Sequence, residues 1–229
     1  MPDPVPGLVP VHAPRAGGDI GFRVDGGAAI LRLNRPAKRN AVSGTMWEAI
    51  GEALGEAAAR PDIRALVIEG LPGVFCAGAD LTVLKGADQD AAAHYRQISL
   101  AGYDSIREFP RPTVAVIDGL CIGGGNNIAL ACDIRLAGPQ ASFAIPAVRH
   151  GIVYDRPTVT RLVELLGSGR ASHLLFTAER IGAARAAEIG LVDVLANDVH
   201  AELTAFLDAL RAADMTTLSA IRELIRQVR

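Results

Sequence analysis

Three consecutive glycines, Gly123, Gly124 and Gly125, follow an apolar run and open a helical pattern in the segment GLCIGGGNNIALACD at 119–133. Without side chains they let a ligand approach the backbone, and the free N–H groups of a helix start, aided by the helix dipole, stabilise negative charge. The segment lacks the Lys-Ser/Thr pair of a phosphate loop and the glycine spacing of a dinucleotide fold. The pattern therefore favours the oxyanion of a thioester as the bound group.

A second loop of small residues, PGVFCAGADL at 72–81, follows the apolar run at 63–68. Two backbone N–H donors from two such loops form an oxyanion hole, in which fixed dipoles stabilise an enolate or a tetrahedral oxyanion without reorganising. The two loops together predict this kind of site.

Hydrophobic periodicity predicts the elements that position these loops. Strands are expected at 28–33, 65–69, 113–117 and 134–137. Helices are expected at 43–59, with Ser43 as N-cap, and at 91–109, 201–211 and 216–228. From residue 157 onward the chain is predicted to be nearly all helical. Strands that alternate with helices favour an α/β fold with parallel pairing and crossover connections.

Composition is that of a globular chain. Its 229 residues are 50% apolar and 21% charged with a net charge of −2, which suits one domain at 19–229 after a flexible Pro-, Gly- and Ala-rich lead-in at 1–18. This balance argues against nucleic-acid or membrane-surface binding, and no apolar run suits a bilayer span or a signal peptide. We expect a cytoplasmic protein with three reduced, buried cysteines, which are Cys76, Cys121 and Cys132.

Five segments, in order, resemble the crotonase (enoyl-CoA hydratase/isomerase) superfamily, and the resemblance covers residues 26–229. They are LNRPAKRNAV at 33–42, FCAGAD at 75–80, the glycine segment, ASFAIP at 141–146 and TAERIGAARAAEIGLV at 177–192. The resemblance implies a spiral of ββα units to about residue 195 and a helical part at 196–229. It also implies an acyl-CoA thioester as substrate, no metal or separate cofactor, and a homotrimer or dimer of trimers.

The same resemblance assigns a candidate site. It implies that the oxyanion donors are the N–H groups of Ala79 and Gly124. Lys38 and Arg39 match contacts to the nucleotide end of coenzyme A, whose phosphates suit two cations; a solvated turn is the alternative. The other expected substrate-binding residues are Ala77, Gly78, Asp80, Leu81, Gly123, Asn127 and Ala147. Asp80 can also cap the next helix.

Two of these positions depart from the hydratase pattern. Family hydratases carry one glutamate two residues after the triple glycine and another after the Phe-x-x-Pro turn, and here these positions hold Asn127 and Ala147. Neither side chain can act as a general base at neutral pH. Asn127 can still orient a water or a substrate oxygen. Ordinary hydration of an enoyl thioester is therefore not the expected reaction.

Another carboxylate is available in the segment GIVYDRPTVTRLVELLG at 151–167. Asp155 matches a working aspartate of dienoyl-CoA isomerases and of 4-chlorobenzoyl-CoA dehalogenase, and Tyr154 matches a tyrosine of members similar to methylmalonyl-CoA decarboxylase. Asp155 can take a proton from a thioester, but before Arg156 and Pro157 it is also a good helix N-cap. Tyr154 can contact substrate or form part of the wall. His150 is a weaker candidate.

Two classes of function remain. The first is an acyl-CoA enzyme that stabilises a thioester enolate, with isomerisation or decarboxylation favoured over hydration. The second is a non-catalytic member that binds acyl-CoA or only assembles; a weak or atypical hydratase is a further alternative. The helices after residue 196 are fewer than family members usually carry, so we expect weaker coenzyme A binding or cover from a neighbouring subunit.

Overall fold

The computed structural model describes residues 9–10, 18–84 and 88–228. Of the predicted lead-in at 1–18, only the strand β1 (Val9–Pro10) and Gly18 belong to the described part. Strand β1 pairs antiparallel with β2. The rest of the predicted lead-in lies outside the described residues, so its flexibility stays a prediction.

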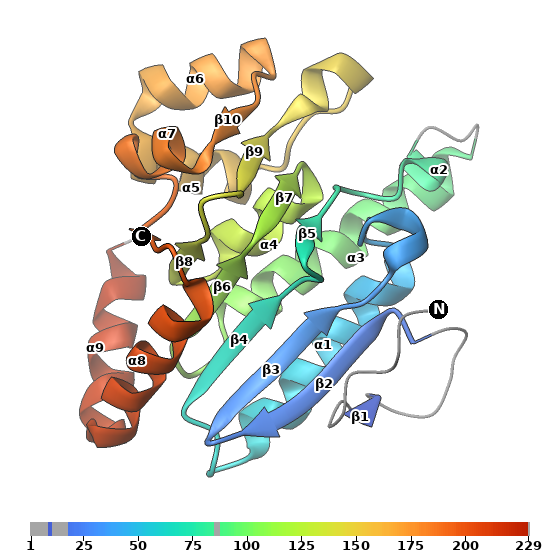
Figure 1. The fold of residues 1–229 in the computed structure, drawn as a ribbon. Coiled ribbons are helices and arrows are strands. Elements are labelled where there is room, and N and C mark those ends of the chain that lie inside the picture. Colours follow the sequence, from blue (N-terminus) through green and yellow to red (C-terminus); the bar gives the residue numbers. More distant parts are fainter. Residues whose placement is uncertain (1–8, 11–17, 85–87, 229) are drawn as a thin grey trace.

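A seven-stranded sheet forms the larger layer of the fold (Figure 1), with strand order β1-β2-β3-β4-β6-β8-β11. Its remaining strands are β2 (Ile20–Asp25), β3 (Ala28–Leu33), β4 (Ala65–Glu69), β6 (Thr113–Ile117), β8 (Ile134–Ala137) and β11 (Val194–Leu195). The pairings from β3 to β11 are all parallel, and β2 pairs antiparallel with β3. This arrangement confirms the predicted α/β class.

A second sheet of four strands carries the glycine segments, in the order β10-β9-β7-β5. Its strands are β5 (Gly73–Cys76), β7 (Gly119–Ile122), β9 (Ser142–Ala144) and β10 (Ile181–Gly182). Strand β7 pairs parallel with both β5 and β9. The two small-residue loops leave neighbouring strands β5 and β7 and therefore meet at one edge of this sheet.

Helices cover both faces of the larger sheet. They are α1 (Gly44–Ala59), α2 (Leu81–Leu84), α3 (Gln89–Arg107), α4 (Gly124–Ala131), α5 (Arg156–Leu166), α6 (Ser168–Thr177), α7 (Ala183–Glu188), α8 (Val199–Ala212) and α9 (Met215–Gln227), with short 3-10 turns η1 (Pro36–Lys38) and η2 (Pro146–His150). Side chains on one face of β3, β4 and β6 pack into the main core with α1 and α3, and the alternate ones pack against α8. Figure 1 shows α1 behind the sheet and α8 beside β6 and β8. No described helix is long and apolar enough to cross a membrane.

The contact between α1 and α3 is close at one point. Trp47 of α1 is 2% exposed, and a Cβ on Gly102 of α3 would lie 2.3 Å from its indole ring. Any larger residue at 102 would therefore push the two helices apart. Ser43 caps α1, as predicted, because its hydroxyl accepts a hydrogen bond from the Met46 amide.

The four predicted strands have the predicted bounds, and the four predicted helices are present with ends shifted by one or two residues. The prediction that the chain is nearly all helical after residue 157 holds except for the two-residue strands β10 and β11. These strands pair with β9 and β8, far away in sequence. Local periodicity carries no signal for such short, long-range pairings.

Candidate active site

The glycine segment turns from β7 into α4 at Gly123, which has φ of 52° and donates its N–H to the Ala144 carbonyl at 2.9 Å. Gly124 is the first residue of α4, so its N–H has no acceptor one turn earlier within the helix. Asn126 holds the loop from inside, since its buried side-chain amide donates to Cys121 and Ala144 carbonyls, both at 2.9 Å.

Ala79, on the other loop, has its amide held in place by its neighbours. Gly78 O accepts from the Val42 amide at 2.8 Å, and the Asp80 amide donates to Val42 O at 2.9 Å. This is one parallel bridge, in which the N–H of the central residue points away from the partner strand. Gly78 has φ of 120°, a value that side chains disfavour. The Ala79 N–H is therefore turned away from Val42.

The two loops approach each other closely at Gly124. A Cβ built on Gly124 would lie 3.0 Å from Ala79 N and 3.1 Å from Gly78 C. Only a residue without a side chain leaves this space between the loops open. The structure therefore brings together the two amides that the family resemblance implies as oxyanion donors.

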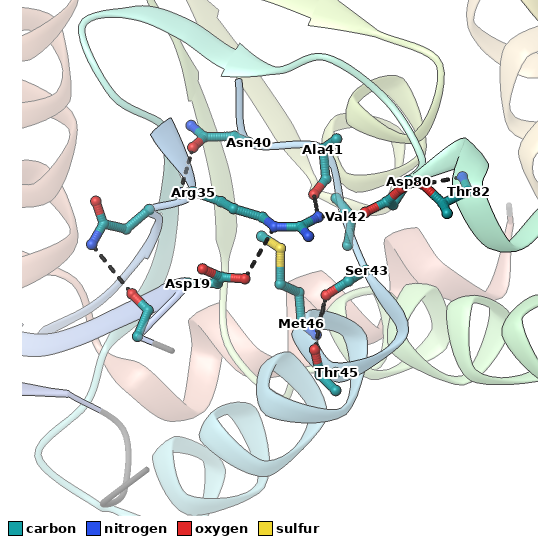
Figure 2. A network of polar contacts seen from close by, with 12 residues as sticks. Asp19, Arg35, Asn40, Ala41, Val42, Ser43, Thr45, Met46, Asp80 and Thr82 are labelled. Atoms are coloured by element: carbon teal, nitrogen blue, oxygen red, sulfur yellow. Dashed lines mark hydrogen bonds and ion pairs between the residues drawn. The ribbon is translucent and has the colours of Figure 1, made fainter. Parts of the chain in front are cut away.

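An arginine behind the Ala79 loop joins it to the segment before α1 (Figure 2). Arg35 Nη1 donates to Asp80 Oδ2 at 2.8 Å and to Ala41 O at 3.0 Å, while its Nε pairs with Asp19 at 3.2 Å. Asp80 also accepts from Thr82 N and Oγ1 at the start of α2, which confirms its predicted capping role. Asp80 therefore contributes to positioning the loop.

The charge state of Asp80 follows from these contacts. Burial raises the pKa of its carboxyl, but the hydrogen bonds from Arg35 and Thr82 outweigh burial and hold the pKa at about 2. The carboxylate is therefore ionised throughout the neutral range, and the ion pair with Arg35 is intact there.

Asn40 is a buried residue that the sequence reasoning missed. Its side-chain amide donates to Val74 and Phe75 carbonyls, both at 3.1 Å, and its Oδ1 accepts from the Arg35 amide at 2.8 Å. Its φ of 58° lies in the left-handed region, which asparagine tolerates better than most residues. The sequence signal that could have identified this residue is an asparagine directly after a short proline-containing turn.

Asp155 is the N-cap of α5, as predicted. Its Oδ1 accepts from Thr158 N at 2.9 Å and from Thr158 Oγ1 at 2.7 Å. Its Oδ2 faces Asn127, whose Nδ2 lies 3.4 Å away. One carboxylate oxygen thus serves the cap, and the other receives a long hydrogen bond from α4. The predicted residues Asn127 and Asp155 are neighbours in space.

Two buried polar atoms beside this pair have no hydrogen-bond partner among the described residues: Asn127 Oδ1 and the Tyr154 hydroxyl. The Tyr154 hydroxyl lies 3.7 Å from where a Cβ on Gly123 would be. Burial, followed by the nearby Asp155 charge, raises the pKa of Tyr154 well above its usual value, so the phenol is a neutral donor. An unpaired buried donor costs free energy until a ligand satisfies it.

A cavity of about 550 Å³ borders Tyr154 on its α5 side. Its wall is formed by Tyr154, Arg156, Val159, Thr160, Val163 and Glu164. The size is in the range of small-molecule sites, and the two valines give part of the wall an apolar surface.

The remaining predicted residues lie around these loops. Lys38 and Arg39 are exposed, and Arg39 O accepts from the Ala77 amide at 2.9 Å, which places that turn beside the Ala79 loop. Leu81 is half-buried at the start of α2, and Ala147 is buried in η2. His150 is exposed at the end of η2.

The three cysteines are free thiols and all are buried, as predicted. Burial raises the pKa of each thiol, that of Cys76 to about 12, so none is a thiolate at neutral pH. Among the described residues no group of three or more His, Cys, Asp or Glu side chains could hold a metal ion.

A family model for enoyl-CoA hydratase/isomerase matches residues 23–227. The chain belongs to this family, as its sequence motifs predicted.

Relatives with 32–34% identity carry hydratase names. A probable enoyl-CoA hydratase of Mycobacterium avium is 33% identical over 217 residues, 90% of this chain and 83% of its own length. The 2,3-dehydroadipyl-CoA hydratase of Escherichia coli is 32% identical over 86% of this chain and 78% of its own length. A bovine mitochondrial enoyl-CoA hydratase domain-containing protein 2 is 34% identical over 73% of this chain, and the match spans 57% of that longer protein.

Solved structures agree with the fold. A putative enoyl-CoA hydratase/isomerase family protein from Hyphomonas neptunium has a TM-score of 0.88 and 32% identity, over 92% of this chain and 82% of its own. DspI from Pseudomonas aeruginosa also has a TM-score of 0.88, with 27% identity over 95% of this chain and 90% of its own. The predicted crotonase-like fold is thus confirmed.

Proposed function

We propose that this protein is an acyl-CoA thioester enzyme in which the amides of Ala79 and Gly124 stabilise an enolate oxygen. The observation that carries the proposal is the close approach of these two loops. The space between them stays open because residue 124 is a glycine. Preorganised N–H donors at such a point stabilise developing negative charge without reorganising. Family membership supports a coenzyme A thioester as the substrate, with Lys38 and Arg39 as contacts for its phosphates.

Asp155 is the proposed proton carrier. Its Oδ1 is used by two hydrogen bonds from Thr158, whereas Oδ2 receives one bond of 3.4 Å from Asn127 and keeps lone pairs available. In a 3-enoyl thioester, Asp155 would take a proton from C2, and the electron pair would delocalise onto the thioester oxygen. Return of that proton to C4 gives the conjugated 2-enoyl isomer.

Hydration is the less favoured reaction. Asn127 and Ala147 stand where the family's hydratases carry glutamates, and neither can activate water. Several relatives are nevertheless named as hydratases. A weak hydratase activity that uses Asp155 is therefore a further alternative, and hydration of crotonyl-CoA would indicate it.

Decarboxylation is a second candidate, which the unpaired Tyr154 hydroxyl favours. A neutral phenol can donate a hydrogen bond to a substrate carboxylate beside the thioester, and loss of CO₂ forms the same enolate without a base. The neighbouring Asp155 carboxylate would repel such a substrate, which places isomerisation first.

The test measures enolate formation directly. The protein is incubated in D₂O with butyryl-CoA, a 3-enoyl-CoA, crotonyl-CoA and methylmalonyl-CoA, and deuterium at C2 and all products are followed by mass spectrometry. We expect exchange at C2 of butyryl-CoA and isomerisation of the 3-enoyl thioester. Binding of these thioesters without exchange or products would instead support the non-catalytic alternative. Absence of binding would contradict the proposed enzyme and would support the non-catalytic member that only assembles.

The assembly is also proposed as a homotrimer or a dimer of trimers, as in the family resemblance. The exposed Ile221, Leu224 and Ile225 of α9 give one helix an uncovered apolar surface, which suits burial against a second subunit. Light scattering at several protein concentrations gives the mass, and a monomer at all of them would contradict the proposal.

A further inference from the structure

A second cavity, of about 260 Å³, has a strongly cationic wall formed by α3, α4, α5 and α9. Four of its wall residues are arginines and one is a glutamate: Arg107, Arg156, Arg161, Arg226 and Glu164. We call it the arginine cavity. It is separate from the two loops of the candidate active site, and it shares Arg156, Thr160 and Glu164 with the cavity beside Tyr154.

The carboxylates that pair with two of these arginines stand outside the cavity wall. Arg107 pairs with Glu108 at 3.1 Å and Asp104 at 3.6 Å, and Arg226 pairs with Glu223 at 3.3 Å. Each guanidinium has five N–H donors in a fixed fork, so these exposed pairs leave donors for the cavity side. Only Glu164 brings a negative charge into the wall itself.

Arg156 has no such partner. It is exposed, and within the described part of the chain no hydrogen bond or ion pair involves its side chain. It is also the first residue of α5, where the positive end of the helix dipole disfavours a cation. The Asp155 carboxylate caps this helix end and offsets the dipole, so a bound anion would act on the charge of Arg156.

The wall is held together by a buried arginine of α9. Arg222, 5% exposed, donates to Asp133 Oδ2 at 2.7 Å and to the Arg107 carbonyl at 3.0 Å. These bonds fix α9 against α3 and so keep Arg226 and Arg107 on the same cavity. Cations held in place before binding lose little freedom when a ligand arrives.

We propose that the arginine cavity binds a compact dianion, namely phosphate or a phosphate monoester. Arginines of α3, α5 and α9 line one small space, and guanidinium donors from three helices suit a tetrahedral group approached from several sides better than one planar carboxylate. The volume is below the usual range for drug-sized ligands and fits a group of this size. This inference does not depend on the proposed reaction.

Isothermal titration of the full chain with inorganic phosphate, at constant low ionic strength set with chloride, tests it. We expect a dissociation constant of about 1 mM or tighter. Arg156→Gln and Arg226→Gln should each weaken binding about tenfold, the effect of losing one charged hydrogen bond. Arg96→Gln, an exposed arginine of α3 outside the cavity wall, is the matched control and should bind as wild type.

Two sources of the phosphate group are separated by titrating coenzyme A and 3′-dephospho-coenzyme A. If coenzyme A supplies the group, removing the 3′-phosphate weakens binding in wild type but not in Arg156→Gln. If free phosphate is the ligand, the two coenzymes respond equally to that substitution. The proposal is overturned if wild type binds no phosphate, or if both cavity variants, shown to be folded by circular dichroism, bind it as tightly as wild type.

Discussion

The side-chain amide of Asn127 lies 3.4 Å from Oδ2 of Asp155, so the residue that replaces a hydratase glutamate contacts the carboxylate proposed as proton carrier. A glutamate at 127 would bring a second negative charge next to Asp155, at a cost that grows with burial. The loss of one carboxylate and the use of the other are therefore consistent with each other.

Asparagine at 155 separates the two roles of this aspartate. Asn caps a helix about as well as Asp but accepts no proton, so Asp155→Asn should stay within about 1 kcal/mol of wild-type stability and lose most C2 exchange. Asp155→Ala should reduce both the stability and the rate of C2 exchange. Urea unfolding and deuterium exchange are measured for each variant.

Asp214 provides a matched control, because it caps α9 with the same two bonds, from Thr217 N at 2.8 Å and Thr217 Oγ1 at 2.7 Å. Asp214→Asn and Asp214→Ala should reproduce the stability pattern while leaving exchange unchanged. Near wild-type exchange in Asp155→Asn would show that the carboxylate at 155 is only a cap.

A single methyl group tests the oxyanion site. Gly124→Ala places a Cβ 3.0 Å from Ala79 N, which fills the gap between the loops. Losing one such donor costs about 10²–10³ in rate, so we expect at least that loss in C2 exchange. Gly51→Ala in α1 meets no atom within 4 Å and should keep full activity. Undiminished C2 exchange in a folded Gly124→Ala protein would contradict the assignment of the Gly124 amide as an oxyanion donor.

Removing the Tyr154 hydroxyl should affect stability and function in opposite directions. Because that oxygen is buried and has no hydrogen-bond partner in the described part of the chain, Tyr154→Phe should leave the ligand-free protein as stable as wild type or more stable, while thioester affinity falls. Tyr95→Phe is the stability control, since its hydroxyl donates to Val42 O at 2.8 Å and its loss should cost about 0.5–1.5 kcal/mol. A Tyr154→Phe protein that is destabilised as much as Tyr95→Phe would mean that the hydroxyl has a partner within the fold.

Asp80 predicts a dependence of stability on pH. Its folded pKa of about 2 lies below the unfolded value of about 3.9, so its contribution is complete above pH 4 and is lost as pH falls toward 2. Asp80→Asn should be less stable than wild type at pH 7, and the difference should narrow below pH 4. Asp25, whose side chain is 70% exposed beside Arg23, is the control, and Asp25→Asn should change stability little at any pH. A constant difference for Asp80→Asn from pH 7 to 2.5 would contradict this assignment.

The sequence was sufficient for the elements with a local signal. The strands β3, β4, β6 and β8 are mostly apolar and mostly buried on both faces, and a helix start with its serine cap is a local pattern as well. Strands β5 and β7 were not predicted because they are rich in small side chains and depend on pairing with each other.

In the candidate site, too, local motifs could be predicted from the sequence and long-range contacts could not. The two glycine loops and the cap at Asp155 are visible as motifs, whereas the contact between Asn127 and Asp155 joins residues 28 positions apart. The support of the Ala79 loop by Arg35 and Asn40 is similarly non-local, since the bonded groups come from different segments. Their types alone did not distinguish them from solvated turn residues.

Trp47, the single tryptophan of the chain, gives the protein an intrinsic fluorescent reporter at the packing of α1 on α3. Its indole is enclosed in the native state, so emission should shift to longer wavelength only when the two helices separate and water reaches the ring. Helix α1 begins two residues after Val42, the residue that bridges to Ala79. The emission wavelength during unfolding should therefore follow the integrity of the oxyanion loop's support without any added label.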